Sequence, residues 1–478
     1  MDWHAAACPG CPHRREYKGL MAEGIPSATV SKDTAPCLRL RSPRDICKED
    51  TYMKKLLALL LALSMVLALV ACGGGGNSGK TNGTTPSTNG EKQPDEGKAG
   101  TSEPEADPIK IGLICVHDIN SGYDAAHIEG LTTACEELDI DVNSQVVFKY
   151  NIPEDETCYD MAVELAEDGC DIIFSDSYGH QTYMGQAASE FSDIVFVACT
   201  GDQAAGSGLD NLKNMFPYTY ESRYVSGVVA GMKLKELMDA GTVTDPYVGY
   251  VGAFPYDEVV CGYTAFFLGI RSIVPEAHMD VQYTNSWYDP VAEGEAANAL
   301  MGKGCVIIGQ HADSTGAPSA VQAALAGGKV AYSVGYNIDM LSVAPDAALT
   351  SAQNNWSVLY KTTLEKFMAG ETVPTDFATG SADGAVMISN LGPACADGTA
   401  EAVDAAWTGI ADGSLKVFDI TTFTVGGETV TSTPALDTNG DFVKDSGEAI
   451  VDGAFMESVV RSAPYFGLRI DGITELNS

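Results

Sequence analysis

The sequence predicts an α/β protein with two doubly wound lobes, each built on a parallel β-sheet. Two observations lead to this prediction. Short apolar runs suited to buried strands alternate with helical segments from residue 109 onward, as in βαβ units. In addition, residues 164–174 (ELAEDGCDIIF) parallel residues 299–309 (ALMGKGCVIIG), where a helix ends in glycine before a cysteine and a strand. The chain therefore contains two similar halves.

The expected elements follow from these apolar runs and from the helical spacing of the apolar residues between them. Strands are expected at 109–116, 146–150, 172–175, 194–198, 248–251, 281–284, 306–309, 330–334 and 348–352. Helices are expected at 125–138, 159–167, 183–190, 223–238, 263–273, 292–301 and 319–325.

Polar loops follow the two repeated strands, at 175–180 (SDSYGH) and 310–315 (QHADST). In open α/β sheets, ligands bind at the carboxyl ends of the strands. The sequence therefore predicts a small-molecule site between the lobes, formed by these loops.

The segment before the first strand predicts an export signal followed by a flexible linker. Two lysines precede an apolar run in residues 53–71, and the run ends in Leu-Val-Ala before Cys72, a small-residue cleavage site. A transmembrane helix is the alternative, but it needs about 20 apolar residues. We expect residues 1–52 to be an upstream extension outside the working protein. Residues 72–107 are rich in Gly, Ser, Thr and Asn and predict a flexible linker.

Composition excludes some partners. The chain has 65 acidic and 28 basic residues, a formal net charge of −37, which repels nucleic acid and anionic membrane surfaces. Eight cysteines follow Cys72, and several lie in apolar strand contexts, so we expect mostly free, buried thiols rather than disulfides.

Several motifs in order resemble the substrate-binding lipoproteins of the basic membrane protein family, whose purine-nucleoside-binding members serve ABC importers. The motifs are GCDIIF at 169–174, SEFSDIVF at 189–196, YVSGVVAG at 224–231, VGYVGA at 248–253 and NSWYDP at 285–290. The resemblance extends from about residue 108 to the C-terminus, and the end of the export signal is similar to a lipobox with Cys72 as the lipidated residue.

The resemblance implies a type I periplasmic-binding-protein fold whose hinge the chain crosses three times. It implies an N-terminal lobe of residues 108–218 and about 351–378, and a C-terminal lobe of residues 219–350 and about 379–478. It also implies a lipid-anchored protein on the extracytoplasmic face of the membrane. Such a protein captures a purine nucleoside or nucleobase without chemistry or cofactor and delivers it to permease and ATPase subunits.

Aromatic and acidic residues at predicted strand ends are the candidate ligand contacts. Tyr123, Tyr178 and Trp287 could stack on a base, a contact that contributes ~1–3 kcal/mol per base in nucleic-acid complexes. Carboxylates bind ring N–H groups or ribose hydroxyls, or else cap helices and turns. The remaining candidates are Asp118, Asn120, Ser177, Asp313, Asp339, Asn354 and Trp356.

A possible calcium loop lies outside the family pattern. Asp437, Asn439, Asp441, Asp445 and Glu448 fall at positions 1, 3, 5, 9 and 12 of an EF-hand-like loop, but position 6 is Phe rather than Gly. A β-hairpin that turns at Asn439-Gly440 explains the same residues, and we favour it.

Other function classes find less support. The chain has no nucleophile elbow, no His-Glu-x-x-His motif and no Walker loop, so an enzyme is not expected. A sugar-binding protein or a sensory solute receptor of the same fold stays open as the alternative.

Overall fold

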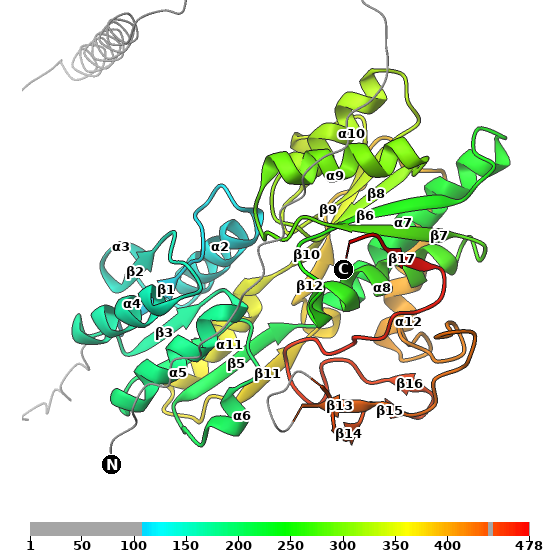
Figure 1. The fold of residues 1–478 in the computed structure, drawn as a ribbon. Coiled ribbons are helices and arrows are strands. Elements are labelled where there is room, and N and C mark those ends of the chain that lie inside the picture. The colour runs from blue at the N-terminus through cyan, green and yellow to red at the C-terminus, as the bar shows by residue number, and fades with distance from the viewer. Residues whose placement is uncertain (1–107, 438–442, 478) are drawn as a thin grey trace, which may run out of the picture. The chain divides into compact units, whose positions relative to one another are not determined.

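The N-terminal lobe is built on a six-stranded, all-parallel sheet with strand order β11-β5-β4-β3-β1-β2 (Figure 1). The computed structural model describes residues 108–437 and 443–477, so the export signal, Cys72 and the linker lie outside the described residues. The strands are β1 (Ile111–Ile114), β2 (Val146–Lys149), β3 (Ile172–Ser175), β4 (Val195–Ala198), β5 (Leu212–Pro217) and β11 (Asp376–Thr379).

Helices cover both faces of this sheet, which explains why its central strands are apolar throughout. On one face Leu131 and Trp356 contribute to a core with Leu113, and on the other Leu165 and Met184 contribute to a second core. The helices are α2 (Gly122–Glu137), α3 (Val142–Gln145), α4 (Glu156–Glu167), η1 (Tyr178–His180), α5 (Gln181–Glu190), α6 (Ala204–Ser207) and α11 (Trp356–Met368).

The C-terminal lobe has a seven-stranded sheet of order β12-β10-β9-β8-β6-β7-β17, in which only β12 runs antiparallel to its neighbour. The strands are β6 (Tyr247–Gly252), β7 (His278–Tyr283), β8 (Ile307–Gln310), β9 (Tyr332–Tyr336), β10 (Ala348–Asn354), β12 (Val386–Ile388) and β17 (Ile473–Glu475). The helices are α7 (Thr219–Asp239), α8 (Asp257–Arg271), α9 (Pro290–Lys303), α10 (Gly316–Ala326), η2 (Met340–Ser342), η3 (Ser381–Asp383) and α12 (Thr399–Ala411).

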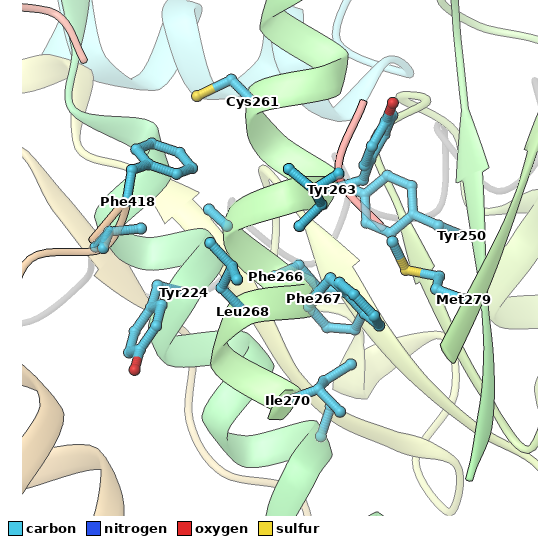
Figure 2. Close-up of a cluster of buried hydrophobic side chains, with 14 of the residues drawn as sticks. Tyr224, Tyr250, Cys261, Tyr263, Phe266, Phe267, Leu268, Ile270, Met279 and Phe418 are labelled. Atoms are coloured by element: carbon cyan, nitrogen blue, oxygen red, sulfur yellow. The ribbon is translucent and has the colours of Figure 1, made fainter. Parts of the chain in front are cut away.

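Helices α7 and α8 pack closely enough that glycine is required at their crossing. A Cβ on Gly227 would lie 2.0 Å from the Phe266 carbonyl oxygen, and a Cβ on Gly269 would lie 2.1 Å from that of Tyr224. Aromatic side chains of α8, with Tyr250 of β6, fill the space between these helices and the sheet (Figure 2). This core anchors the N-terminal turn of α8, which reaches the site described below.

The segment between α12 and β17 adds two small antiparallel pairs. They are β13 (Pro434–Leu436) with β14 (Ser446–Glu448), and β15 (Ile450–Val451) with β16 (Ala454–Phe455). Phe418 and Phe466 of this segment stack with ring centroids 4.2 Å apart and join the core beneath α7 and α8. We call residues 412–472 the C-terminal segment.

The chain passes between the two sheets three times, after β5, after β10 and after β11. These passages follow Pro217, Asn354 and Thr379. The lobe boundaries that the family resemblance implies lie near residues 218, 350 and 378. Within residues 108–437 and 443–477, no helix is both long and apolar enough to span a bilayer.

The cysteines of the described part are all free thiols, as expected. They are Cys115, Cys135, Cys158, Cys170, Cys199, Cys261, Cys305 and Cys395, and only Cys395 is not fully buried.

Candidate ligand-binding site

A narrow cavity of about 20 Å³ lies at the carboxyl ends of strands from both sheets. We call it the inner cavity. Its lining residues are Val116, Tyr123, Asp176, Ser177, Tyr178 and Thr200 from the N-terminal lobe, and Glu258, Trp287, His311, Asp313 and Tyr336 from the C-terminal lobe.

Aromatic side chains form much of the lining. Contacts with neighbouring residues hold three of them, Tyr123, Tyr178 and Trp287, in place. The Tyr123 hydroxyl lies 2.8 Å from the Asp176 carbonyl oxygen and 3.1 Å from that of Cys199, and it donates to them. The Tyr178 hydroxyl donates to Asp202 Oδ2 at 3.0 Å. The Trp287 ring stands edge-on to Phe254 with centroids 5.1 Å apart. These contacts fix the ring planes before any ligand arrives.

The indole N–H of Trp287 is buried and has no hydrogen-bond partner among the described residues. A buried, unpaired donor costs free energy unless a partner satisfies it. Because Trp287 lines the inner cavity, a bound molecule with an acceptor atom could supply that partner.

Two buried carboxyls line the inner cavity, Asp176 from the N-terminal lobe and Asp313 from the C-terminal lobe. Burial, and then the charge of Asp124, raises the pKa of Asp176 well above its usual value. Burial likewise raises the pKa of Asp313, whose Oδ1 accepts a hydrogen bond from Asn337 Nδ2 at 2.8 Å. The protonated form of each carboxyl can donate as well as accept hydrogen bonds.

Asp124 is buried near the inner cavity and forms a pair with Asp176, in which Asp124 is the ionised carboxyl. Burial disfavours its charge, but hydrogen bonds from His117 and Ser121 outweigh that effect and lower its pKa. The His117 backbone N–H donates to Asp124 Oδ1 at 2.7 Å. When the environments of two neighbouring carboxyls shift their pKa values in opposite directions, the pair holds one proton between them.

The structure brings five of the ten sequence-predicted contacts to the inner cavity: Tyr123, Ser177, Tyr178, Trp287 and Asp313. The Ser177 hydroxyl is already engaged, since it donates to Glu154 Oε1 at 2.6 Å.

The other five predicted contacts do not line the inner cavity. Asp118 and Asn120 pair with each other on an exposed loop, where Asn120 Nδ2 lies 2.7 Å from Asp118 Oδ1. Asp339 caps η2 by accepting from the Leu341 N–H at 2.9 Å. Asn354 accepts from the Thr219 hydroxyl at 2.8 Å. Trp356 is buried in the core behind Tyr123 and stacks on His127 with centroids 3.7 Å apart.

Sequence reasoning did not select Val116, Asp176, Thr200, Glu258, His311 and Tyr336 as contacts. Asp176 and His311 lie inside the polar loops at 175–180 and 310–315, so the position after a buried strand was the available signal. Glu258 gave no such signal, because it lies in the first turn of α8.

The calcium hypothesis is only partly open to inspection, because Asn439 and Asp441 lie outside the described residues. The described flanks form the antiparallel pair β13–β14, in which Pro434 faces Glu448 and Leu436 faces Ser446. Glu448 Oε1 accepts from the Thr433 N–H at 3.0 Å and from the Ile450 N–H at 2.8 Å. This carboxylate therefore already serves the strand pair that the hairpin alternative requires.

Comparison with known proteins identifies the family. The family model described as "ABC transporter substrate-binding protein PnrA-like" matches residues 109–409. A putative ABC transporter glucose-binding protein of Haloferax volcanii is 30% identical over 318 residues, which cover 66% of this chain and 74% of the relative. A purine-binding protein of Brucella abortus is 32% identical over 253 residues, which cover 53% and 67%.

Solved structures show the same fold. A solute-binding protein of an ABC transporter system from Conexibacter woesei is 22% identical with a TM-score of 0.51, covering 64% of this chain and 98% of that chain. A solute-binding protein from Aeropyrum pernix is 16% identical with a TM-score of 0.56, covering 65% and 93%. Two parallel-sheet lobes with a cavity at their strand ends agree with these neighbours and confirm the type I periplasmic-binding fold. The chain belongs to the family of PnrA-like ABC transporter substrate-binding proteins, which capture solutes and are not enzymes.

Proposed function

We propose that this protein binds a purine nucleoside or nucleobase between its lobes and delivers it to the permease of an ABC importer. In this proposal Cys72 carries a lipid that holds the protein at the extracytoplasmic face of the membrane. The linker of residues 72–107 then gives the two lobes reach toward the permease.

The observation that carries the purine assignment is the combination of flat and polar groups in the inner cavity. Tyr123, Trp287 and Tyr336 offer ring faces or edges, the unpaired Trp287 N–H offers a donor, and the carboxyls of Asp176 and Asp313 offer further hydrogen-bonding groups. Purines carry ring nitrogens that accept hydrogen bonds, and a neutral heterocycle matches such a site. The Brucella abortus relative, a purine-binding protein, supports the same assignment.

A sugar is the second candidate, because the Haloferax volcanii relative is a putative glucose-binding protein. Aromatic faces and carboxyls also suit the apolar faces and hydroxyls of a hexose. The two ligand classes differ in whether they fill the cavity with a planar ring.

The deciding experiment is native purification of the full chain, followed by denaturation and mass spectrometry of the released ligand. Calorimetric titration of the emptied protein with adenosine, guanosine, inosine, adenine and glucose then ranks the affinities. We expect a purine compound to be released and to bind more tightly than glucose. Release of a hexose, with no heat from any purine, would overturn the purine assignment. Labelling with radioactive palmitate that disappears in Cys72→Ser would establish the anchor.

A further inference from the structure

Residues 457–466 of the C-terminal segment form a closed loop, and one carboxylate holds the two ends of this loop together. Glu457 is buried, and its Oε1 accepts hydrogen bonds from the backbone N–H groups of Ser458 at 2.8 Å and Tyr465 at 3.0 Å. Its Oε2 accepts from the Phe466 N–H at 2.6 Å. Compact loops whose ends adjoin in this way are frequently functional. We call residues 457–466 the interlobe loop, because it contacts both lobes.

The base of the interlobe loop belongs to the core of the C-terminal lobe. Tyr465 and Phe466 are fully buried in that core. The Phe466 ring stands edge-on to Phe455 with centroids 4.7 Å apart, in addition to its stack on Phe418. Because burial of several aromatic side chains is a stronger attachment than one polar contact, the base of the loop moves with the C-terminal lobe.

The tip of the interlobe loop contacts the N-terminal lobe through two residues. Arg461 Nη1 lies 2.8 Å from Oδ2 of Asp202, which belongs to the loop after β4. The Ser462 backbone N–H donates to Asp376 Oδ1 of β11 at 2.7 Å. Arg461 is also held from within the interlobe loop, because its Nε donates to the Ala463 carbonyl oxygen at 3.3 Å. The loop therefore presents a fixed cation to the N-terminal lobe.

The two contacts at the tip respond differently to rotation about the hinge. Asp376 begins β11, and the chain passes to the C-terminal lobe directly after this short strand, so rotation moves Asp376 little. Asp202 lies in the cleft, where its Oδ2 also accepts from the hydroxyl of Tyr178, a residue of the inner cavity. Separation of the lobes therefore stretches the ion pair between Arg461 and Asp202 more than the bond to Asp376.

The interlobe loop also borders a space that adjoins the inner cavity. Arg461, Ala463 and Pro464 line a second cavity of about 470 Å³. Tyr178 and Thr200 line this second cavity and the inner cavity alike. The loop is therefore a wall at the place where the narrow inner cavity meets a larger space, and a contact between the lobes at this place opposes widening of the inner cavity.

We propose that the interlobe loop is a clasp that holds the two lobes closed over the inner cavity, and that the cleft opens by breaking the ion pair between Arg461 and Asp202. Two-lobed binding proteins close around their ligands by rotation about a hinge. The clasp favours the closed arrangement whichever solute the cleft contains, because its contacts involve protein atoms alone. The interlobe loop lies beyond residues 109–409, the part of the chain that the family model matches.

The test is hydrogen–deuterium exchange with mass spectrometry on the full chain, after release of any bound solute. In Arg461→Gln, peptides that contain the loops 175–180 and 310–315 should exchange about threefold to tenfold faster. These loops line the inner cavity and gain access to water when the lobes separate. Peptides of the α7–α8 crossing around Gly227 should keep the wild-type rate, since that packing lies within one lobe.

Lys444→Gln is the matched control. Lys444 Nζ lies 2.7 Å from Asp257 Oδ2, and this ion pair stays within the C-terminal lobe because Asp257 begins α8. The Lys444 ammonium and the Arg461 guanidinium lie at nearly equal distances from the centre of the Tyr465 ring, 5.9 Å and 5.8 Å. Loss of the lysine charge should leave the exchange of both cavity loops unchanged.

A second variant keeps the test open if Arg461→Gln does not fold. Asp202→Asn removes the other charge of the pair and should produce the same selective rise in exchange. Wild-type exchange in the folded variant, or a rise that Lys444→Gln reproduces, would overturn the clasp. A uniform rise over the whole chain, including the α7–α8 crossing, would also overturn it, because the ion pair would then contribute to overall stability alone.

Discussion

Arg461 Nη1 lies 2.8 Å from Asp202 Oδ2, and this ion pair joins the C-terminal segment to the N-terminal lobe next to Tyr178. The same carboxylate oxygen accepts from the Tyr178 hydroxyl at 3.0 Å, and both charged side chains are less than one-fifth exposed. Residue 461 lies beyond the part of the chain that the family model matches. An ion pair made by a residue outside the family match therefore helps to hold Tyr178, an aromatic residue of the inner cavity.

Arg461→Ala should lower the free energy of unfolding by about 1–3 kcal/mol, because it leaves a mostly buried carboxylate with a weaker set of donors. Ligand should also dissociate faster, since Tyr178 loses the rigid acceptor behind it. Urea unfolding and stopped-flow release measure the two effects. Lys235→Ala breaks an exposed pair with Asp239 and should cost less than about 0.5 kcal/mol. Equal costs for the two variants would show that the Arg461 pair is an ordinary surface contact.

Two substitutions of Tyr123 should separate the contribution of its hydroxyl from that of its aromatic ring. Tyr123→Phe removes a donor to the Asp176 and Cys199 carbonyls and should cost about 1 kcal/mol of unfolding free energy with little change in ligand affinity. Tyr123→Leu also removes the aromatic face and should weaken binding of a purine by about 1–3 kcal/mol. Calorimetry on both variants checks this order, and a larger affinity loss in the phenylalanine variant would contradict it.

Acid should destabilise the protein partly through His127. Burial lowers the pKa of this histidine from 6.5 to about 3, and its Nδ1 lies 2.7 Å from the Tyr360 hydroxyl. The unfolded chain therefore binds a proton that the folded chain refuses, and stability falls as the pH drops from about 6.5 toward about 3. Within that window, His127→Asn should reduce the slope of unfolding free energy against pH by up to about 1.4 kcal/mol per pH unit.

Tyr360→Phe is the control for this measurement, because it breaks the same contact without removing the histidine. Its slope should match that of the wild-type chain. If both variants flatten the slope equally, the loss of the contact rather than the titration of His127 is responsible.

The fully buried thiols of the two lobes should not react with alkylating reagents in the native protein. Burial raises the pKa of Cys115, Cys199 and Cys261, so they are both inaccessible and protonated. Iodoacetamide should modify the half-buried Cys395 first among the eight described cysteines, as mapped by mass spectrometry. A reducing agent should leave the unfolding midpoint unchanged, and a clear drop would reveal a disulfide that contradicts the structure.

Sequence patterns predicted the buried strands best, because their apolar runs leave little choice of structure. The strand at 172–175 has the expected bounds, and the alternation through β10 was predicted. Strand β5 was not, since Lys213 and Asn214 interrupt its apolar run. Both are buried, and Asn214 Oδ1 accepts from the Ala204 N–H at 2.9 Å. Only the tertiary partner explains a polar residue at that position.

The sequence predicted which loops form the site better than it predicted which residues line it. Strand β9 runs two residues past its expected end at 334, so Tyr336 faces the inner cavity. Asn337 then adopts a φ of 62° and turns the chain away, which leaves Asp339 to cap η2. A shift of two residues at a strand end therefore decides which side chain meets the ligand, and apolar periodicity does not resolve such a shift.

The N–H of Gly122 donates to the Asp313 carbonyl oxygen at 2.9 Å, so the two lobes touch through main-chain atoms beside the inner cavity. Every residue type except proline can make such a bond. Mutations that retune the surrounding side chains for a new solute therefore leave this contact in place. A change of solute specificity through those side chains would therefore keep the same main-chain link between the lobes.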